Sequence, residues 1–197
     1  MDNSFIGGAL FARAAIKPAL RLVEPHRIAV DFGAYVQATH LSHDSSTAVW
    51  EVQAMSDQSS MLARRVAASM YGSDNCSRWL GMSLEEVRAG YARMRMPVRP
   101  EFLNGLGICH GGLMFTLADS TFAFAANSHN IPAVAASCAI EFLRPVVRGD
   151  ILTAECNEQT MTGRHGIYDI KVTNAAAEVV ALFRDKSAQL KSHIVET

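Results

Sequence analysis

The sequence predicts an α+β fold in which an antiparallel sheet wraps around one long central helix. Three patterns indicate this fold: a long apolar run at residues 112–127, an alternating segment before it, and four strand-like segments after it. The four segments span residues 133–143, 151–161, 166–173 and 178–189. A nearly all-apolar helix must be buried on most sides, and a curled sheet can bury it.

The apolar run at residues 112–127 is predicted to be a helix rather than a strand. It is rich in Leu, Ala, Met and Phe, lacks β-branched enrichment and is too long for a typical strand. Residues 61–71 are predicted to form an earlier helix. Between the two, apolar side chains alternate with Arg93 and Arg95 in residues 91–98, which predicts a strand with one solvated face.

The four later strands are expected to form a meander. Turn residues separate them at positions 148–150, 162–163 and 174–177. Short turns favour antiparallel pairing of neighbouring strands.

Residues 1–60 are predicted to be a poorly ordered N-terminal extension, and residues 61–191 the folded domain. Prolines and polar runs break any sustained period in the first part. A short amphipathic helix is possible around residues 8–22, and residues 56–60 are predicted to be a linker or a helix start. No apolar run approaches the ~20 uninterrupted residues that a membrane-spanning helix needs.

The composition of the chain argues against nucleic-acid binding, a disulfide framework and a metal site. The 197 residues are 49% hydrophobic and 19% charged, with a formal net charge of −1. A near-neutral chain lacks the basic footprint of nucleic-acid-binding proteins. The four cysteines form no C-x-x-C pair, so we expect reduced thiols in a cytoplasmic protein. No His, Cys, Asp or Glu spacing suggests a metal site.

Asp119 is the only ionisable side chain between His110 and His129. A carboxylate inside an apolar helix is costly unless it is paired, hydrogen-bonded or shifted in pKa. Asp119 is therefore either paired with a buried partner or held for chemistry.

Gly111 and Gly112 open the predicted helix, whose first backbone N–H groups have no intrahelical partner. Such donors can polarise a carbonyl oxygen, as in an oxyanion hole. Asp119 lies eight residues further on, ~12 Å along the axis, so one substrate carbonyl cannot meet both groups of one helix. If both are functional, two chains must share composite sites across a two-fold axis. Helix-start and packing roles for the glycines stay open, as do a turn role for Asn104 and a structural role for His110.

The sequence resembles the hotdog-fold acyl-CoA thioesterases, most of all the PaaI branch of phenylacetic acid degradation. The motif that carries the resemblance is NGxGxxHGGxxFxLADxxFAxAxNS, residues 104–128. IEFLRP at 140–145, GDxLTA at 149–154 and GxYDIxVTN at 166–174 add to it. The resemblance covers about residues 61–190, and it implies a hotdog fold.

The resemblance implies that Asp119 activates water or attacks the thioester, while the Gly111 N–H polarises its carbonyl. It places Asn104, His110 and Gly112 at substrate-orienting positions, with Ser137 as a weaker polar candidate. The implied substrate is phenylacetyl-CoA or a hydroxyphenylacetyl-CoA. No cofactor is implied, because coenzyme A is part of the substrate. The implied assembly is a homodimer with composite sites, and a homotetramer in much of the family.

Several roles stay open. Arg144, Arg148 and Arg184 either meet coenzyme A phosphates or are solvated surface charges. Three phenylalanines of the predicted helix, at 115, 122 and 124, suit either an aromatic acyl group or a packed core. The rival functions are a hotdog dehydratase of 3-hydroxyacyl thioesters with His110 as base, and a non-catalytic acyl-CoA-binding module.

Overall fold

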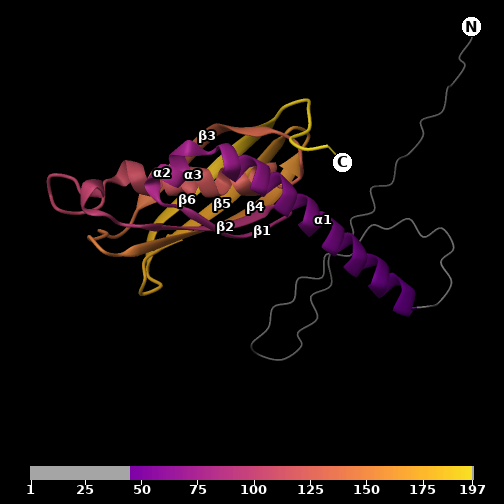
Figure 1. Ribbon diagram of the computed structural model, residues 1–197, viewed down its shortest axis with the longest axis horizontal. Coiled ribbons are helices and arrows are strands. Elements are labelled where there is room, and N and C mark those ends of the chain that lie inside the picture. Colours follow the sequence, from indigo (N-terminus) through magenta and orange to yellow (C-terminus); the bar gives the residue numbers. More distant parts are fainter. Residues whose placement is uncertain (1–44, 197) are drawn as a thin grey trace, which may run out of the picture. The chain divides into compact units, whose positions relative to one another are not determined.

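The computed structural model describes residues 45–196, and Figure 1 shows their arrangement. Three α-helices, one 3-10 helix and six strands follow one another in this part of the chain. In chain order they are α1 (Ser45–Ser73), α2 (Asn75–Leu80), β1 (Ser83–Arg88), β2 (Tyr91–Pro97), η1 (Pro100–Phe102), α3 (Gly111–Asn127), β3 (Ala133–Phe142), β4 (Ile151–Thr162), β5 (His165–Thr173) and β6 (Val179–Gln189).

The strands form one six-stranded sheet in the order β1-β2-β4-β5-β6-β3, and every neighbouring pair is antiparallel. Helix α3 contacts all six strands, and in Figure 1 it lies along the sheet. This arrangement confirms the predicted α+β fold with a sheet around one central helix.

The core lies between α3 and the sheet. Leu117, Phe122 and Phe124 of α3 are buried, together with Met94 and Met96 of β2. Alternation places the apolar side chains of β2 against α3 and leaves Arg93 and Arg95 on the other face, where they form ion pairs with Glu85. The predicted wet and dry faces of this strand are therefore confirmed.

The predicted four-strand meander is wrong in one pairing. Strands β4, β5 and β6 follow one another as neighbours, but β3 pairs with β6 rather than with β4. The chain after β3 crosses the end of the sheet, where the Cys109 N–H donates to the Val146 carbonyl and the Val98 N–H to that of Asp150. These bonds hold the segment between β3 and β4 beside the end of β2. Strand β4 therefore starts next to β2 and pairs with it, and β3 remains at the edge of the sheet.

Near the N-terminal side one further expectation needs correction, and one strand was missed. Residues 56–60, predicted as a linker or helix start, lie inside α1, which also runs through the predicted boundary at residue 60. Strand β1 was not predicted, because Glu85, Glu86 and Arg88 obscure its alternation at this exposed sheet edge. The helix suggested at residues 8–22 lies outside the described residues. Within the described part, no helix is long and apolar enough to cross a membrane.

Candidate active site

The start of α3 carries a backbone donor without an intrahelical acceptor. His110 is the N-cap residue, and its Nδ1 accepts the Gly112 N–H at 3.1 Å. The Leu113 N–H donates to the His110 carbonyl at 2.9 Å. Among the described residues no acceptor pairs with the Gly111 N–H, so it is the donor left free at the positive end of the helix dipole.

His110 is committed to this cap. An Nδ1 that accepts the Gly112 N–H places the proton of the neutral ring on Nε2, so neither ring nitrogen of this tautomer is free to take a proton from a substrate. The geometry thus gives His110 the structural role left open by the sequence, and it weakens the dehydratase alternative, which needs His110 as a base.

Asn104 shapes the loop that leads into α3. Its Oδ1 accepts the Leu106 N–H at 2.9 Å and the Ile108 N–H at 3.4 Å. Its own N–H donates to the Ile108 carbonyl at 2.8 Å, and Gly107 takes a φ of 75°. Asn104 is therefore the turn residue of this loop, and its side chain also faces the adjoining cavity.

A cavity of about 380 Å³ opens beside the start of α3. Residues from the loop, from α3 and from the chain after β3 line it: Asn104, Ile108, Cys109, Gly111, Met114, Phe142, Leu143, Arg144 and Pro145. A Cβ on Gly111 would lie 3.0 Å from Cζ of Phe142, so a larger residue here would require the half-exposed Phe142 ring to shift. The cavity brings Asn104 and Gly111 together.

Asp119 lies elsewhere on the same helix. It is half-buried in the middle of α3, and it does not line the cavity at Gly111. Burial raises the pKa of its carboxyl, and no cation or hydrogen-bond donor of the described residues pairs with it. The buried partner that was one sequence-based interpretation is therefore absent from the described part of the chain.

Ser137 is exposed on β3, directly opposite Lys186 of β6. Opposite residues in an antiparallel pair share a face, and successive residues alternate between faces. Ser137 and Lys186 therefore lie on one face of the sheet, and Cys138 and Asp185 lie on the other. Neither Ser137 nor Asp119 lines the cavity at Gly111. Within one chain, Asp119 and Gly111 therefore do not meet.

The structure also decides between the two uses proposed for the aromatic residues of α3. Phe115 packs edge-on against Phe183, and Phe122 packs edge-on against Tyr168. Phe124 is buried near Tyr71. All three phenylalanines of α3 therefore pack in the core.

The candidate arginines differ in availability. Arg184 forms two 2.6 Å bonds with the Asp169 carboxylate, which lowers the pKa of that carboxyl. Arg144 lines the cavity and donates to the Val179 carbonyl at 2.7 Å. Of these two, Arg144 is the one whose position suits contact with a ligand in the cavity.

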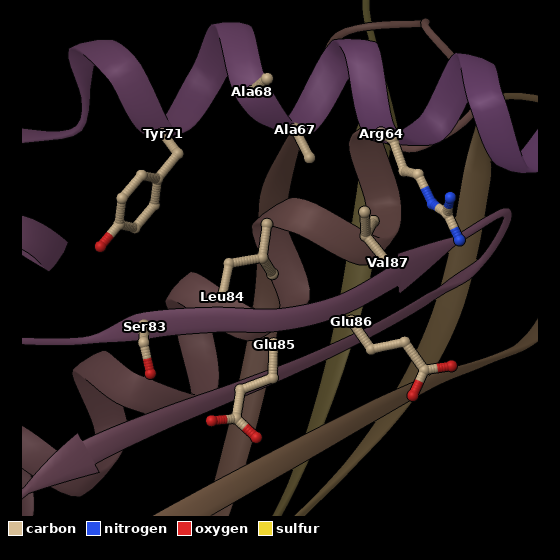
Figure 2. Close-up of a pocket in the computed structure, with 9 residues that line it drawn as sticks. All are labelled: Arg64, Ala67, Ala68, Tyr71, Ser83, Leu84, Glu85, Glu86 and Val87. Atoms are coloured by element: carbon tan, nitrogen blue, oxygen red, sulfur yellow. The ribbon is translucent and has the colours of Figure 1, made fainter.

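A larger cavity, of about 620 Å³, lies between α1 and β1, and none of the candidate site residues lines it. Figure 2 shows Leu84 and Val87 pointing toward α1, while Glu85 and Glu86 point away from it. Both glutamates form ion pairs with Arg93. No candidate catalytic residue lines this cavity.

One buried carboxyl was not singled out from the sequence. Asp185 of β6 is fully buried, and neither of its carboxyl oxygens has a hydrogen-bond partner among the described residues. The available signal was the alternation of β6, which puts Asp185 on the same face as Phe183 and Ser187.

Comparison with known proteins agrees with this geometry. The model of the Thioesterase superfamily matches residues 106–181. The acyl-coenzyme A thioesterase PaaI of Escherichia coli (strain K12) is 43% identical over 124 residues, which cover 63% of this chain and 89% of the relative. A putative esterase of Archaeoglobus fulgidus is 36% identical over 123 residues, 62% of this chain and 80% of the relative.

The solved structure of the E. coli PaaI protein from the phenylacetic acid degradation operon aligns with a TM-score of 0.67 and 41% identity. The alignment covers 68% of this chain and 97% of that protein. The chain therefore belongs to the hotdog-fold thioesterase superfamily, in its PaaI branch, and is a thioester hydrolase.

Proposed function

We propose that this thioester hydrolase acts on acyl-CoA substrates, and specifically on phenylacetyl-CoA or a hydroxyphenylacetyl-CoA, releasing free coenzyme A in aromatic catabolism. The observation that carries the catalytic part is the Asp119 carboxyl, which no described residue pairs with, on a helix that begins with a Gly111 N–H equally without a partner in the described part of the chain. The substrate class is supported by the relative named acyl-coenzyme A thioesterase and by its origin in a phenylacetic acid degradation operon.

Asp119 and Gly111 must act from different chains. They are eight residues apart on one straight element, ~12 Å along its axis, whereas both must reach the same thioester carbonyl. The proposed site therefore joins Asp119 of one chain to Gly111 of the partner subunit.

Strand β3 offers the surface for this pairing. It is a ten-residue edge strand with exposed backbone groups, and its Val134 and Phe142 are about half exposed, at 51% and 50%. A long uncovered edge is a template for pairing with a second strand. We propose a homodimer that joins two β3 edges, and a homotetramer as a pair of such dimers. Ser137, which lies on β3, would then be close to this interface.

The proposed reaction needs one base and one oxyanion donor. The Asp119 carboxylate takes a proton from water, and the water oxygen bonds to the thioester carbonyl carbon. The carbonyl π electrons move to the oxygen, which accepts the N–H of Gly111 of the partner subunit. When the carbonyl re-forms, the C–S bond breaks and coenzyme A leaves as a thiolate, a good leaving group because thiols have a pKa of ~8.5.

In the alternative route, the carboxylate bonds to the carbonyl carbon and expels the thiolate, and water then opens the anhydride. A single turnover in oxygen-labelled water tests for the anhydride. Label in Asp119 indicates an anhydride that water opened at the aspartyl carbon.

The test is coenzyme A release from phenylacetyl-CoA, followed with a thiol reagent, for the wild type and Asp119→Asn. We expect turnover to fall by roughly 10²- to 10⁴-fold, the usual contribution of a general base. Asp57→Asn is the matched control, since Asp57 is exposed on α1. Equal turnover in Asp119→Asn and wild type would remove Asp119 from catalysis. Binding of aromatic, short and long acyl-CoA without any hydrolysis would favour the binding-module alternative.

A further inference from the structure

Asp185 lies under the face of α3 that presents Asp119. Phe115 of α3 packs edge-on against Phe183 of β6, with ring centroids 5.1 Å apart. Four residues along the helix, ~6 Å, lead from Phe115 to Asp119. Two residues along the strand, ~6.7 Å, lead from Phe183 to the next residue on the same face, Asp185.

A second contact gives the same register. Phe122, three residues after Asp119, packs edge-on against Tyr168 with centroids 5.2 Å apart. Tyr168 is the partner of Asp185 across the β5–β6 pair. The two aromatic contacts therefore bracket the position at which Asp119 faces Asp185.

None of the described ionisable side chains that face Asp185 carries a positive charge. The ionisable groups that face it are Asp119 of α3, Cys138 of β3, Cys156 of β4 and Tyr168 of β5. The Tyr168 hydroxyl donates to Glu158 at 2.7 Å and is not available to Asp185. On its own strand, Arg184 is exposed and paired with Asp169.

This environment favours the neutral acid. Burial, followed by the negative charge of Asp119, raises the pKa of the Asp185 carboxyl to about 7, and the nearby Lys186 N–H offsets only part of this. The carboxyl is thus protonated in mildly acidic solution and ionised in mildly basic solution, with Asp119 beside it in both states.

We propose that Asp185 is a positioning residue that, once ionised, strengthens Asp119 as a base, so that turnover rises in a second step with pH. This inference rests on the proposed catalytic role of Asp119. When water attacks, negative charge leaves Asp119 and appears on the thioester oxygen. An ionised Asp185 repels negative charge on the adjacent Asp119 more strongly than negative charge on the more distant thioester oxygen. It therefore raises the energy of the ground state more than that of the transition state.

The proton balance is simple. Asp185 releases its proton to solvent before the reaction and takes no proton during it. The proton of the attacking water goes to Asp119, and the coenzyme A thiolate or solvent receives it afterwards. In the anhydride route charge also leaves Asp119, so the same repulsion acts in the same direction.

The test is the pH profile of kcat/KM for phenylacetyl-CoA between pH 5 and 9, in wild type and Asp185→Asn. The amide keeps the shape of the protonated acid but cannot ionise. We expect two rising steps in the wild type and only the lower one in the variant. At pH 8.5 the variant should be roughly threefold to tenfold slower, with a ratio near one at pH 5.5, since the efficiency of a general base follows its strength.

Asp169→Asn is the matched control, because Asp169 also lies on a strand beside β6 but pairs with Arg184 on the surface. It should keep both steps. Infrared spectra of the wild type and of Asp119→Asn add a readout that does not depend on folding of the Asp185 variant: a protonated carboxyl band should persist at pH 5.5 and vanish near pH 8.

Retention of the upper step in Asp185→Asn, or an ionised Asp185 at pH 5.5, would overturn the inference. These results are distinct from failure of the proposed function, which would appear as full activity of Asp119→Asn at every pH.

Discussion

The start and the middle of α3 are chemical opposites. At the start, the Gly111 N–H is a free donor beside an open cavity. In the middle, Asp119 is a half-buried acceptor that lies over a second, fully buried carboxyl. A thioesterase needs both a donor for the oxyanion and an acceptor for the proton, yet one helix separates them by ~12 Å. The difference teaches that each α3 would serve two sites. Its Gly111 N–H would belong to one site, and its Asp119 carboxyl would belong to the other.

After loss of Asp119, the largest expected effect comes from removing the donor at Gly111. Gly111→Pro deletes the N–H at the first helical position, where proline is tolerated. We expect kcat to fall by roughly 10²- to 10³-fold, the usual cost of one oxyanion donor. Gly111→Ala is the matched control, since it adds the same Cβ against Phe142 but keeps the N–H. Similar losses in the two variants would mean that packing, not hydrogen bonding, requires glycine.

Mixing the two inactive proteins tests whether the helix serves two sites. Chains carrying Asp119→Asn and chains carrying Gly111→Pro should, after reversible dissociation and reassociation, recover about a quarter of the wild-type activity. Half of the dimers are then mixed, and each mixed dimer has one intact composite site. Activity that stays at the level of the separate variants would place both groups of a site in one chain.

A smaller effect is expected on stability, through Asp185 of β6 beneath the middle of α3. The folded pKa of Asp185 is about 7, above the 3.8 of an unfolded aspartate, so folding holds a proton that the unfolded chain releases. Stability from this group is complete below about pH 4 and is lost as the pH rises to about 7. Between pH 5 and pH 8 the wild type should lose on the order of 3 kcal/mol relative to Asp185→Asn. Denaturant unfolding at both pH values measures this, and parallel curves would show an already ionised Asp185.

The smallest effect is expected at the cap of α3. His110→Ala removes the acceptor of the Gly112 N–H and should lower the free energy of unfolding by about 1 kcal/mol. His110→Asn restores a good N-cap side chain and should recover most of this loss. If turnover falls in both variants while stability recovers in the asparagine variant, His110 contacts substrate as well as capping the helix.

Much of the fold could be predicted because its patterns are local. The composition of α3 and the alternation of β2 each follow from a short stretch of chain. The pairing of β3 could not, because it depends on where the chain after β3 crosses the sheet end and binds the backbone at Cys109 and Val98. Strand β1 escaped prediction because charged residues occupy most of this exposed sheet edge.

The candidate site divides in the same way. Asp119 and Gly111 could be found because a lone carboxylate and a glycine pair stand out in an apolar run. The cap made by His110 and the turn made by Asn104 are also local, yet their hydrogen bonds became clear only from coordinates. Asp185 could not be recognised, because 66 residues separate it from Asp119 and charged neighbours in β6 hide its inward position.

By itself, the sequence determined which residues carry chemistry and which period each element follows, because both depend on side-chain types and their spacing along the chain. Only the tertiary structure decided which of those residues meet. The register of α3 over β6 places Asp119 above Asp185, which spacing along the chain could not show. This result comes from packing between distant segments, where burial without a partner sets the charge of a carboxyl, whereas the ~12 Å between Asp119 and Gly111 already followed from their spacing on one helix.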